Sequence, residues 1–383
     1  MQRKSIAPPP QLFLDGSDLY ASQGSVYALN GKDGSVRQIY PISGQLAVAN
    51  DVLYLNVSHH PDYLVQALRS SDGSVLWSYK AEGRLVQSPV ISNERVYVCT
   101  TEGGIYALHA SDGTLLWHFT ITLGPHVPSY LGPIVFTAPT IINDMLYLAP
   151  NVNFPLKPFI YAFQAKDGVL LWQNPIPAAS SVSFAASDGI LCLSIFNGCL
   201  ALDMNDGSVV WQKEFDPAFQ VISQPVVLNG IVYLCFSEYK DDLSSDERIP
   251  GQQPFICALE AKNGSLLWQQ SFGGMLQASS PAKLSVMDNV LLISSYDGVL
   301  YTYQRDNGKI RWSYKISENF LSSPIATKDV VYVSDSEGYI YALSLTDGTL
   351  LWQSSVSPTK ISTASISLSQ SSVLPPSGWI QIR

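Results

Sequence analysis

Short apolar runs recur along this chain, separated by small polar residues. The stretch 105–117 reads Ile-Tyr-Ala-Leu-His-Ala-Ser-Asp-Gly-Thr-Leu-Leu-Trp, which is an apolar run, a turn and a second apolar run. Apolar runs of this length bounded by Asn, Asp, Ser and Gly are typical of β-strands joined by tight turns. Versions of this stretch occur from one end of the chain to the other, so we predict one β-rich unit that is repeated.

The spacing of the turns gives the length of the unit. An Asp-Gly or Asn-Gly pair occurs at 33–34, 72–73, 112–113, 167–168, 206–207, 263–264, 307–308 and 347–348, at intervals of 39, 40, 55, 39, 57, 44 and 40 residues. A period near 40 with several short strands is the signature of a repeat architecture. The sequence therefore predicts eight copies of one supersecondary unit.

One copy illustrates the predicted unit. Between Ser88 and Trp117 we expect strands at 90–91, 95–100, 105–109 and 114–119, joined by tight turns into a four-stranded antiparallel meander. In the turn before the fourth strand, Asp accepts hydrogen bonds from the following amides, and Gly adopts the positive φ that other residues reach only at a cost.

A tryptophan follows the turn glycine by four residues in seven of the copies. These residues are Trp77, Trp117, Trp172, Trp211, Trp268, Trp312 and Trp352. A buried Trp removes roughly 150–250 Å² from water. Seven of them at one repeat position indicate packing between units, not seven binding sites. In the first copy Gln38 stands at this position.

The repeated Tyr-Ala-Leu, Asp-Gly and Leu-Trp resemble the quinoprotein-type (PQQ-like) β-propeller repeat with its tryptophan docking motif. Clear copies of the first motif lie at 27–29, 106–108, 161–163 and 341–343. The family includes quinone-dependent alcohol dehydrogenases, the propeller lipoprotein of the outer-membrane assembly machine, and sensor propellers attached to membrane Ser/Thr kinases. The resemblance implies an all-β fold, an eight-bladed β-propeller of four-stranded antiparallel blades with tryptophan docking motifs.

We expect three segments in the chain. Residues 1–11 form a Pro-rich lead, residues 12–353 form the propeller, and residues 354–383 form a C-terminal tail. The eighth tryptophan, Trp379, lies in this tail. We predict that the tail returns to the seam between the first and last blades, where Trp379 compensates for Gln38; the alternative is a tail that packs elsewhere.

Charge and composition exclude some functions. With 22 Lys and Arg against 31 Asp and Glu, a net charge of -9 and no basic run, the chain lacks the basic face that nucleic-acid binding needs. No apolar segment reaches the length of a membrane span, and no apolar run follows Arg3 and Lys4, so we find neither a span, an anchor nor a secretory signal in this sequence. We expect a monomer.

The five cysteines all lie in apolar runs, at Cys99, Cys192, Cys199, Cys235 and Cys257. We interpret them as small buried hydrophobic residues. A two-residue turn at Asn197-Gly198 would place Cys192 opposite Asp203, so we expect Cys192 and Cys199 to lie far apart on their hairpin.

The meander predicts two different rims. If each blade begins at the centre, the blade-to-blade connections and the turns between second and third strands share one rim, here called the loop rim. The remaining turns share the opposite rim, here called the turn rim. The insertions at 59–63, 150–158 and 238–254 are second-to-third-strand loops, and 121–133 connects blades three and four. All four are predicted on the loop rim, and long loops in compact domains are usually functional.

Two groups of residues are candidates for binding. On the loop rim they are His59, His60, Asp62, Tyr63, His126, Tyr130, Phe154, Lys157, Tyr239, Asp241, Asp242 and Arg248. In the central funnel they are Arg84, Gln87, Gln220, Gln224 and Gln277, which would form a polar channel for water or a small ligand. The aromatic residues of the first group have no blade core to fill, and exposed aromatic side chains are typical of protein or glycan contacts.

The histidine and acidic residues of the loop rim give weak metal signals. Adjacent histidines point apart on a strand, and no further ligand has diagnostic spacing. The acidic cluster at 238–248 suggests a cation or a basic peptide, but it lacks the order of a calcium loop. A solvated charged loop is the alternative in both cases.

Catalysis is not supported by a recognisable motif. The resemblance to quinone-dependent dehydrogenases implies an adjacent-cysteine ring, a calcium ion held by Glu, Asn and Asp, and a catalytic Asp. This sequence has no Cys-Cys pair and no positions that match those ligands. We therefore predict no cofactor and disfavour PQQ with calcium.

The favoured function is a non-catalytic recognition or assembly scaffold of the cell envelope. It would bind a protein or peptide through the loop rim. The alternatives are a quinone-dependent dehydrogenase-like enzyme and the extracellular sensor domain of a membrane Ser/Thr kinase.

Overall fold

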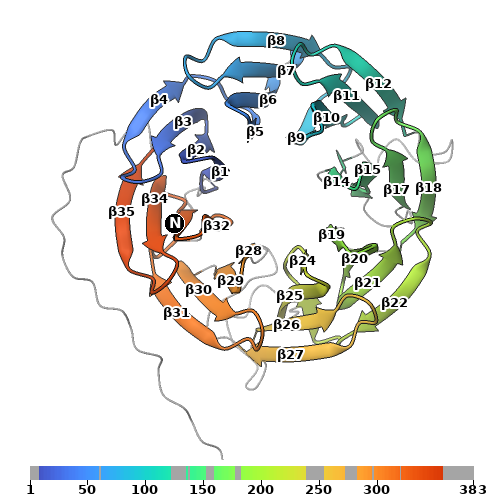
Figure 1. The fold of residues 1–383 in the computed structure, drawn as a ribbon, viewed down its shortest axis with the longest axis vertical. Helices are drawn as coiled ribbons and strands as arrows, with labels where there is room; N and C mark the ends of the chain where they lie inside the picture. The colour runs from blue at the N-terminus through green and yellow to red at the C-terminus, as the bar shows by residue number, and fades with distance from the viewer. Residues whose placement is uncertain are drawn as a thin grey trace, which may run out of the picture.

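The chain folds into a ring of β-sheets around a central axis (Figure 1). The computed structural model describes residues 8–59, 62–121, 135–136, 139–151, 159–176, 183–238, 254–271, 283–295, 297–319 and 321–356. Within these residues all regular structure is β, with eight blades built on antiparallel four-stranded meanders. The predicted eight-bladed propeller is therefore confirmed.

The first four blades follow one another along the chain. Blade 1 contains β1 (Gln11–Asp15), β2 (Asp18–Gln23), β3 (Ser25–Asn30) and β4 (Val36–Tyr40). Blade 2 contains β5 (Gln45–Ala49), β6 (Val52–His59), β7 (Asp62–Arg69) and β8 (Val75–Lys80). Blade 3 contains β9 (Leu85–Ser92), β10 (Arg95–Thr100), β11 (Gly104–His109) and β12 (Leu115–Thr120). Blade 4 contains β14 (Thr140–Ile142), β15 (Met145–Leu148), β17 (Phe159–Gln164) and β18 (Leu170–Pro175), and the short β13 (Val135–Phe136) and β16 (Pro150–Asn151) pair beside it.

The other four blades complete the ring. Blade 5 contains β19 (Phe184–Ser187), β20 (Ile190–Ile195), β21 (Gly198–Asp203) and β22 (Val209–Glu214). Blade 6 contains β23 (Phe219–Val221), β24 (Val226–Leu228), β25 (Ile231–Glu238), β26 (Phe255–Glu260) and β27 (Leu266–Ser271). Blade 7 contains β28 (Lys283–Met287), β29 (Val290–Ser294), β30 (Val299–Gln304) and β31 (Ile310–Lys315). Blade 8 contains β32 (Ile325–Ala326), β33 (Val330–Ser334), β34 (Tyr339–Ser344) and β35 (Leu350–Ser355).

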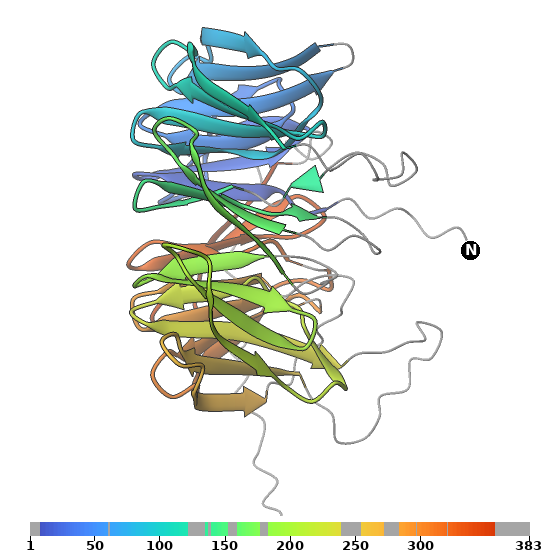
Figure 2. The same cartoon turned by 90° about the vertical axis from the view of Figure 1, so that its right-hand side faces the viewer.

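Each blade starts at the axis and ends at the circumference. In Figure 1 the first strands, such as β1, β5 and β9, surround the centre, and the fourth strands, such as β4, β8 and β12, form the outer wall. Antiparallel order then puts the turns between strands one and two and between strands three and four on the turn rim, at the left of Figure 2. The strand ends that lead into the insertions face the loop rim, at the right.

The hydrophobic core lies between blades, not inside one sheet. Along β10, Val96 and Val98 pack with residues of blade 2, whereas Tyr97 and Cys99 pack with residues of blade 4. Alternate side chains of a strand point to opposite faces of its sheet. Because each blade is packed between two neighbouring blades, both faces of its inner strands are buried. This explains why the second and third strands read as unbroken apolar runs.

The tryptophans join neighbouring blades. Each of the seven indoles donates a hydrogen bond to the backbone carbonyl three residues before the turn glycine of the next blade. The bonds run from Trp77 to Ala110 (2.8 Å), Trp117 to Ala165 (2.9 Å), Trp172 to Met204 (3.1 Å), Trp211 to Ala261 (2.7 Å), Trp268 to Arg305 (3.0 Å), Trp312 to Leu345 (3.1 Å) and Trp352 to Gly31 (3.0 Å).

The turn glycine makes room for the indole. At the seven glycines that meet a tryptophan, an added Cβ would lie 2.4–2.7 Å from an indole carbon. At Gly113, for example, φ is +73° and the Cβ would lie 2.5 Å from Cε3 of Trp77. Glycine is thus required in this turn for two reasons: its φ is positive, and the indole of the preceding blade occupies the space of a Cβ.

A tyrosine hydroxyl reinforces three of these seams. Tyr97, Tyr147 and Tyr332 lie on second strands and donate to the same carbonyls that accept from Trp117, Trp172 and Trp352. The ring centroids of each tyrosine and tryptophan are 5.8–6.0 Å apart, a distance typical of favourable aromatic pairs. One carbonyl of the next blade therefore accepts two donors at these seams.

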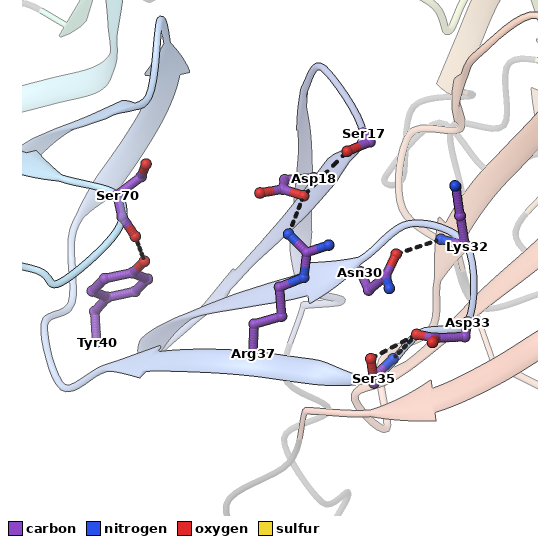
Figure 3. A network of polar contacts seen from close by, with 9 residues as sticks. All are labelled: Ser17, Asp18, Asn30, Lys32, Asp33, Ser35, Arg37, Tyr40 and Ser70. Carbon is purple, nitrogen blue, oxygen red and sulfur yellow. Dashed lines mark hydrogen bonds and ion pairs between the residues drawn. The ribbon is translucent and has the colours of Figure 1, made fainter.

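Blade 1 has no docking tryptophan, and a different residue makes the contact with the next blade. Gln38 pairs with Ala28, as Trp77 pairs with Ala67, so it occupies the tryptophan position. Two residues later, the Tyr40 hydroxyl donates to the Ser70 carbonyl, three residues before Gly73 (Figure 3). Burial raises the pKa of Tyr40 to about 12, which keeps this donor protonated. Tyr40 thus makes, from blade 1, the contact with the turn of the next blade that a tryptophan makes from each of the other blades.

Blades 1 and 8 close the ring through side chains. Trp352 and Tyr332 both donate to the Gly31 carbonyl, and Ser334 Oγ donates to the Pro10 carbonyl at 2.6 Å. Among the described residues, both blades consist of consecutive strands, β1 to β4 and β32 to β35. Residues 357–383, including Trp379, lie outside the described residues, and the predicted tail seal stays a prediction.

The prediction that Cys192 and Cys199 of blade 5 lie far apart is wrong. Ile195 pairs with Gly198 and Cys192 with Ala201, so the register differs from the predicted one and Cys192 becomes a diagonal neighbour of Cys199. The neighbouring Cys192 thiol and burial both raise the pKa of Cys199. All five cysteines are buried free thiols, in agreement with the interpretation as core residues.

The turn aspartates are held by the residue after the glycine. Asp33 Oδ1 accepts from Ser35 Oγ at 2.6 Å and from the Ser35 amide at 2.9 Å (Figure 3). These hydrogen bonds stabilise the charged carboxylate and lower the pKa of Asp33. The pKa is lowered in the same way at Asp72, Asp112, Asp206 and Asp347.

Gly113→Ala is expected to destabilise the protein more than Gly189→Ala. Both glycines have positive φ, +73° and +79°, but nothing lies within 4 Å of a Cβ at Gly189. The backbone cost of about 1–3 kcal/mol is common to both variants, and displacement of Trp77 adds about 1–3 kcal/mol at Gly113 only. Urea unfolding of the two variants measures the difference, and equal losses would contradict the role of the indole.

Tyr40→Phe is expected to lower the free energy of unfolding by about 0.5–1.5 kcal/mol, since it removes the hydroxyl that holds Ser70. Gln38→Ala, on the same strand, is the control and should change stability by less than about 0.5 kcal/mol. Thermal and urea unfolding distinguish the two. A larger loss for Gln38→Ala would show that the tryptophan position still carries the first seam.

We expect the free energy of unfolding to fall in acid, because the turn aspartates become protonated. A carboxylate whose pKa is lowered by folding stabilises the protein above its unfolded pKa, and this contribution is lost as the pH falls below about 4. Asn keeps the Oδ1 acceptor, as Asn263 shows by accepting from the Ser265 amide at 2.8 Å. Changing Asp33, Asp72, Asp112, Asp206 and Asp347 to Asn should therefore flatten the decline of unfolding free energy in acid. An unchanged slope would argue against these hydrogen bonds.

Candidate functional site

The loop rim is where the repeat is interrupted. The described strands that precede three insertions, β12, β16 and β25, end at this rim at Thr120, Asn151 and Glu238. Nine of the predicted rim residues lie outside the described residues, and their positions stay predictions. They are His60, His126, Tyr130, Phe154, Lys157, Tyr239, Asp241, Asp242 and Arg248. The predicted funnel residue Gln277 also lies outside.

The segment around His59 is a hairpin and not a long loop. The backbone of His59 pairs with Asp62, so only residues 60–61 separate β6 from β7. Asp62 forms an ion pair with Lys80 at 2.8 Å, but both side chains are more than half exposed and such pairs contribute little. Tyr63 is half-buried and packs against the core between blades 2 and 3. Our expectation that Tyr63 has no core to fill is therefore wrong.

Metal ligands do not gather in the described part of the chain. Within those residues no group of three or more His, Cys, Asp or Glu side chains is placed to hold a metal ion. The same residues contain no helix that is long and apolar enough to cross a membrane.

A cavity of about 920 Å³ opens at the centre of the ring, on the loop-rim side, and we call it the funnel. Its described walls are Pro8, Pro9, Pro10, Gln11, Leu12, Phe13, Ser22, Gln23, Gly24, Gly44, Gln45, Ser88, Gln224, Leu321, Ser322 and Ser323. They come from blades 1, 2, 3, 6 and 8, whose first strands surround the centre in Figure 1. Gln224, one of the predicted funnel residues, is in this wall.

Three predicted funnel residues are not in the wall of the cavity. Arg84 is exposed and precedes β9. Gln87 sits in an irregularity of β9 with φ of 63°, where its carbonyl accepts from Asn56 Nδ2 at 2.8 Å, and the next residue, Ser88, faces the cavity instead. Gln220 lies on β23, a short strand that pairs with the far end of β25.

One position of the repeat supplies most of the polar wall. It lies two residues before the first-strand residue that pairs with a second-strand tyrosine: Phe13 with Tyr20, Ala47 with Tyr54, Val90 with Tyr97, Val226 with Tyr233 and Ile325 with Tyr332. The wall residues at this position are Gln11, Gln45, Ser88, Gln224 and Ser323. Each is a Gln or Ser followed by Leu or Pro and two apolar residues. This pattern was available in the sequence.

Blade 8 anchors one edge of the funnel. Ser322 donates its amide to the Ser334 carbonyl at 2.8 Å, and Ser322 Oγ accepts from the Ser334 amide at 3.0 Å. Ser334 Oγ in turn reaches the Pro10 carbonyl across the seam. The first and last blades therefore share this part of the wall.

A buried aspartate supports this edge from behind. Asp335 is 2% exposed and accepts from the amides of Glu337 and Tyr339 and from the Tyr341 hydroxyl at 2.9 Å. Burial and the adjacent Asp335 carboxylate raise the pKa of Tyr341, so the hydroxyl remains a donor. Asp335 also forms a β-bridge with Leu321 of the wall. The sequence analysis did not single out Asp335, whose role depends on this turn geometry.

The chemistry of the funnel is neutral. Among the described residues its wall carries side-chain amides, hydroxyls and prolines, but no Asp, Glu, His, Lys, Arg or Cys. Those are the groups that most often serve general acid–base and covalent catalysis. The described wall is therefore suited to hydrogen-bond a neutral polar ligand.

Known proteins with related sequences include both assembly factors and an enzyme. The outer membrane protein assembly factor BamB of Yersinia pestis is 24% identical over 283 residues, which are 70% of this chain and 64% of that protein. The tetrathionate hydrolase of Acidithiobacillus ferrooxidans is 24% identical over 305 residues, 74% of this chain and 55% of that protein. The chain thus spans less than two thirds of the length of these two relatives.

Solved structures share the fold. BamB from Moraxella catarrhalis superposes with a TM-score of 0.57 at 18% identity, covering 82% of this chain and 85% of that chain. A quinohemoprotein alcohol dehydrogenase from Pseudomonas putida superposes with a TM-score of 0.59 at 14% identity, covering 86% and 69%. At these identities the likeness concerns the fold alone.

The family comparison covers most of the propeller. The family described as outer membrane protein assembly factor BamB matches residues 22–134, 157–244 and 255–376. These segments contain the repeated turns from Gly34 to Gly348 and all seven docking tryptophans. The chain belongs to the family of the outer membrane protein assembly factor BamB.

Proposed function

We propose that this protein is a non-catalytic scaffold in the assembly of outer-membrane proteins, that it works in the cell envelope without a cofactor, and that it binds a protein or peptide through the loop rim. Membership of the BamB family supports the process and the location. The neutral funnel supports recognition over catalysis.

The observation that carries the proposal is the difference between the two rims. On the turn rim, the Asp-Gly turns receive the docking residues of the preceding blade and are committed to holding the ring together. On the loop rim, the strands end in segments that depart from the repeat. Residues that vary while the repeat is maintained are free to contact a partner.

A quinone-dependent dehydrogenase is the second candidate, because the fold matches a quinohemoprotein alcohol dehydrogenase. The absence of a Cys-Cys pair from the sequence speaks against it. Equilibrium dialysis of the purified protein with pyrroloquinoline quinone and calcium distinguishes the candidates. Stoichiometric uptake would replace the scaffold proposal with an enzymatic one.

The scaffold proposal is tested in a bacterial host that lacks its own BamB-family protein, with this chain exported by the host factor's leader. We expect the chain to restore the amount of protein inserted in the outer membrane. The variant Tyr130→Ala/Tyr239→Ala/Arg248→Ala should lose this rescue, because aromatic and Arg anchors each contribute about 2 kcal/mol or more at many interfaces.

The matched control is Lys166→Ala/Lys262→Ala, which changes two exposed residues of the turn rim. It should rescue as well as the unaltered chain, and both variants should keep its melting temperature. Equal rescue by the loop-rim and turn-rim variants would contradict the assignment of the partner to the loop rim.

A further inference from the structure

The funnel wall presents hydrogen-bonding groups that the protein itself does not use. Gln11, Gln45 and Gln224 are exposed to the cavity. In the part of the chain that the structure describes, their side-chain amides make no hydrogen bond. They lie on three different blades at the same repeat position. The wall therefore offers amide donors and acceptors from several directions toward one open space.

A peptide segment already lies against this wall. The chain's own Pro8, Pro9 and Pro10 line the funnel. Gln23 Nε2 donates to the Pro8 carbonyl at 2.8 Å, and Ser334 Oγ donates to the Pro10 carbonyl at 2.6 Å. Gln23 belongs to the wall, whereas Ser334 is buried behind Ser322, so one wall side chain and one buried side chain each donate to a main-chain carbonyl of a proline.

Proline suits such a wall for two physical reasons. It has no backbone N–H, so a run of prolines presents carbonyl acceptors to the wall's donors. Its ring restricts φ, so a proline-containing segment is extended before it binds and loses less conformational entropy on binding. The contact between Gln23 and the Pro8 carbonyl shows one wall glutamine donating to such a segment.

We propose that the funnel is a binding site for an extended, uncharged, proline-containing peptide segment of a partner protein. The carbonyls of that segment accept hydrogen bonds from Gln11, Gln45 and Gln224. Residues 8–10 occupy one edge of the same site. This inference rests on the proposed function in one respect, since it requires a protein partner at the loop rim.

The composition of the wall selects this ligand class. The described wall has no charged side chain to pair with an ionic ligand. Its aromatic residue, Phe13, is half-buried, so the described wall lacks the exposed stacking surfaces that sugar rings use. A peptide is favoured over an oligosaccharide because a wall glutamine, Gln23, already donates to a peptide carbonyl.

The probe is a fluorescent, end-capped peptide with the sequence of residues 7–13, Ala-Pro-Pro-Pro-Gln-Leu-Phe, and the measurement is fluorescence anisotropy with the full chain. We expect saturable binding. Gln45→Ala/Gln224→Ala should weaken it roughly 5- to 150-fold, as loss of two hydrogen bonds predicts. The same peptide with its three prolines changed to alanine should bind more weakly.

Gln173→Ala/Gln269→Ala is the matched control, because both glutamines are exposed on outermost strands. It should bind the peptide as the unaltered chain does, and both double variants should keep its melting temperature, since all four residues are exposed. No binding at millimolar peptide, equal binding by the two double variants, or binding of maltohexaose in place of the peptide would each overturn the proposal.

The two proposals fail separately. If Gln45→Ala/Gln224→Ala lacks peptide binding and also lacks rescue of outer-membrane assembly, the funnel ligand belongs to the proposed function. If the peptide does not bind while the loop-rim variant still loses rescue, the funnel proposal is wrong and the scaffold proposal stands.

Discussion

The contact between an aromatic donor and a turn of the next blade is the constraint on which the ring depends. Each indole requires an unhindered glycine beside it and a backbone carbonyl three residues earlier. Both requirements are met by one tight turn whose aspartate is held by the following hydroxyl or amide. Because every blade supplies a donor to one neighbour and a turn to the other, the motif is repeated until the last blade meets the first. Trp352 and Gly31 make that final contact in the same way.

This construction separates the two faces of the molecule. The turn rim contains the glycines and carbonyls that receive the docking residues, so an insertion there would disturb a seam. The strand ends that face the loop rim lead into the interruptions of the repeat. The inner strands add the polar wall of the funnel at the same side. The proposed recognition face is therefore the rim opposite the turns that hold the ring together.

Much of the fold was predictable because the structure of each repeat depends on interactions between residues that are close in the sequence. Strand runs, Asp-Gly turns and Trp positions depend on neighbours within about ten residues, and these predictions agree with the strands observed. The funnel was less accessible. Gln224 was identified, but Gln11 and Gln45 were missed, because which inner-strand residue faces the axis depends on register. Because of the irregularity in β9, Ser88 lines the cavity and Gln87 does not. The prediction that Cys192 and Cys199 lie far apart was wrong for the same reason, since a small change of register alters every cross-strand neighbour.

The sequence by itself determined the number of blades, the order of their strands and the seven tryptophans that dock them, because a 40-residue period leaves each unit unable to bury its apolar faces alone. Only the tertiary structure decided how the exceptional positions are used. Tyr40 reaches Ser70 although Gln38 holds the tryptophan position, and Asp335 supports the funnel although nothing marks it locally. These roles depend on contacts between residues of different strands or blades. The spacing along the chain does not encode such contacts, whereas packing in three dimensions does.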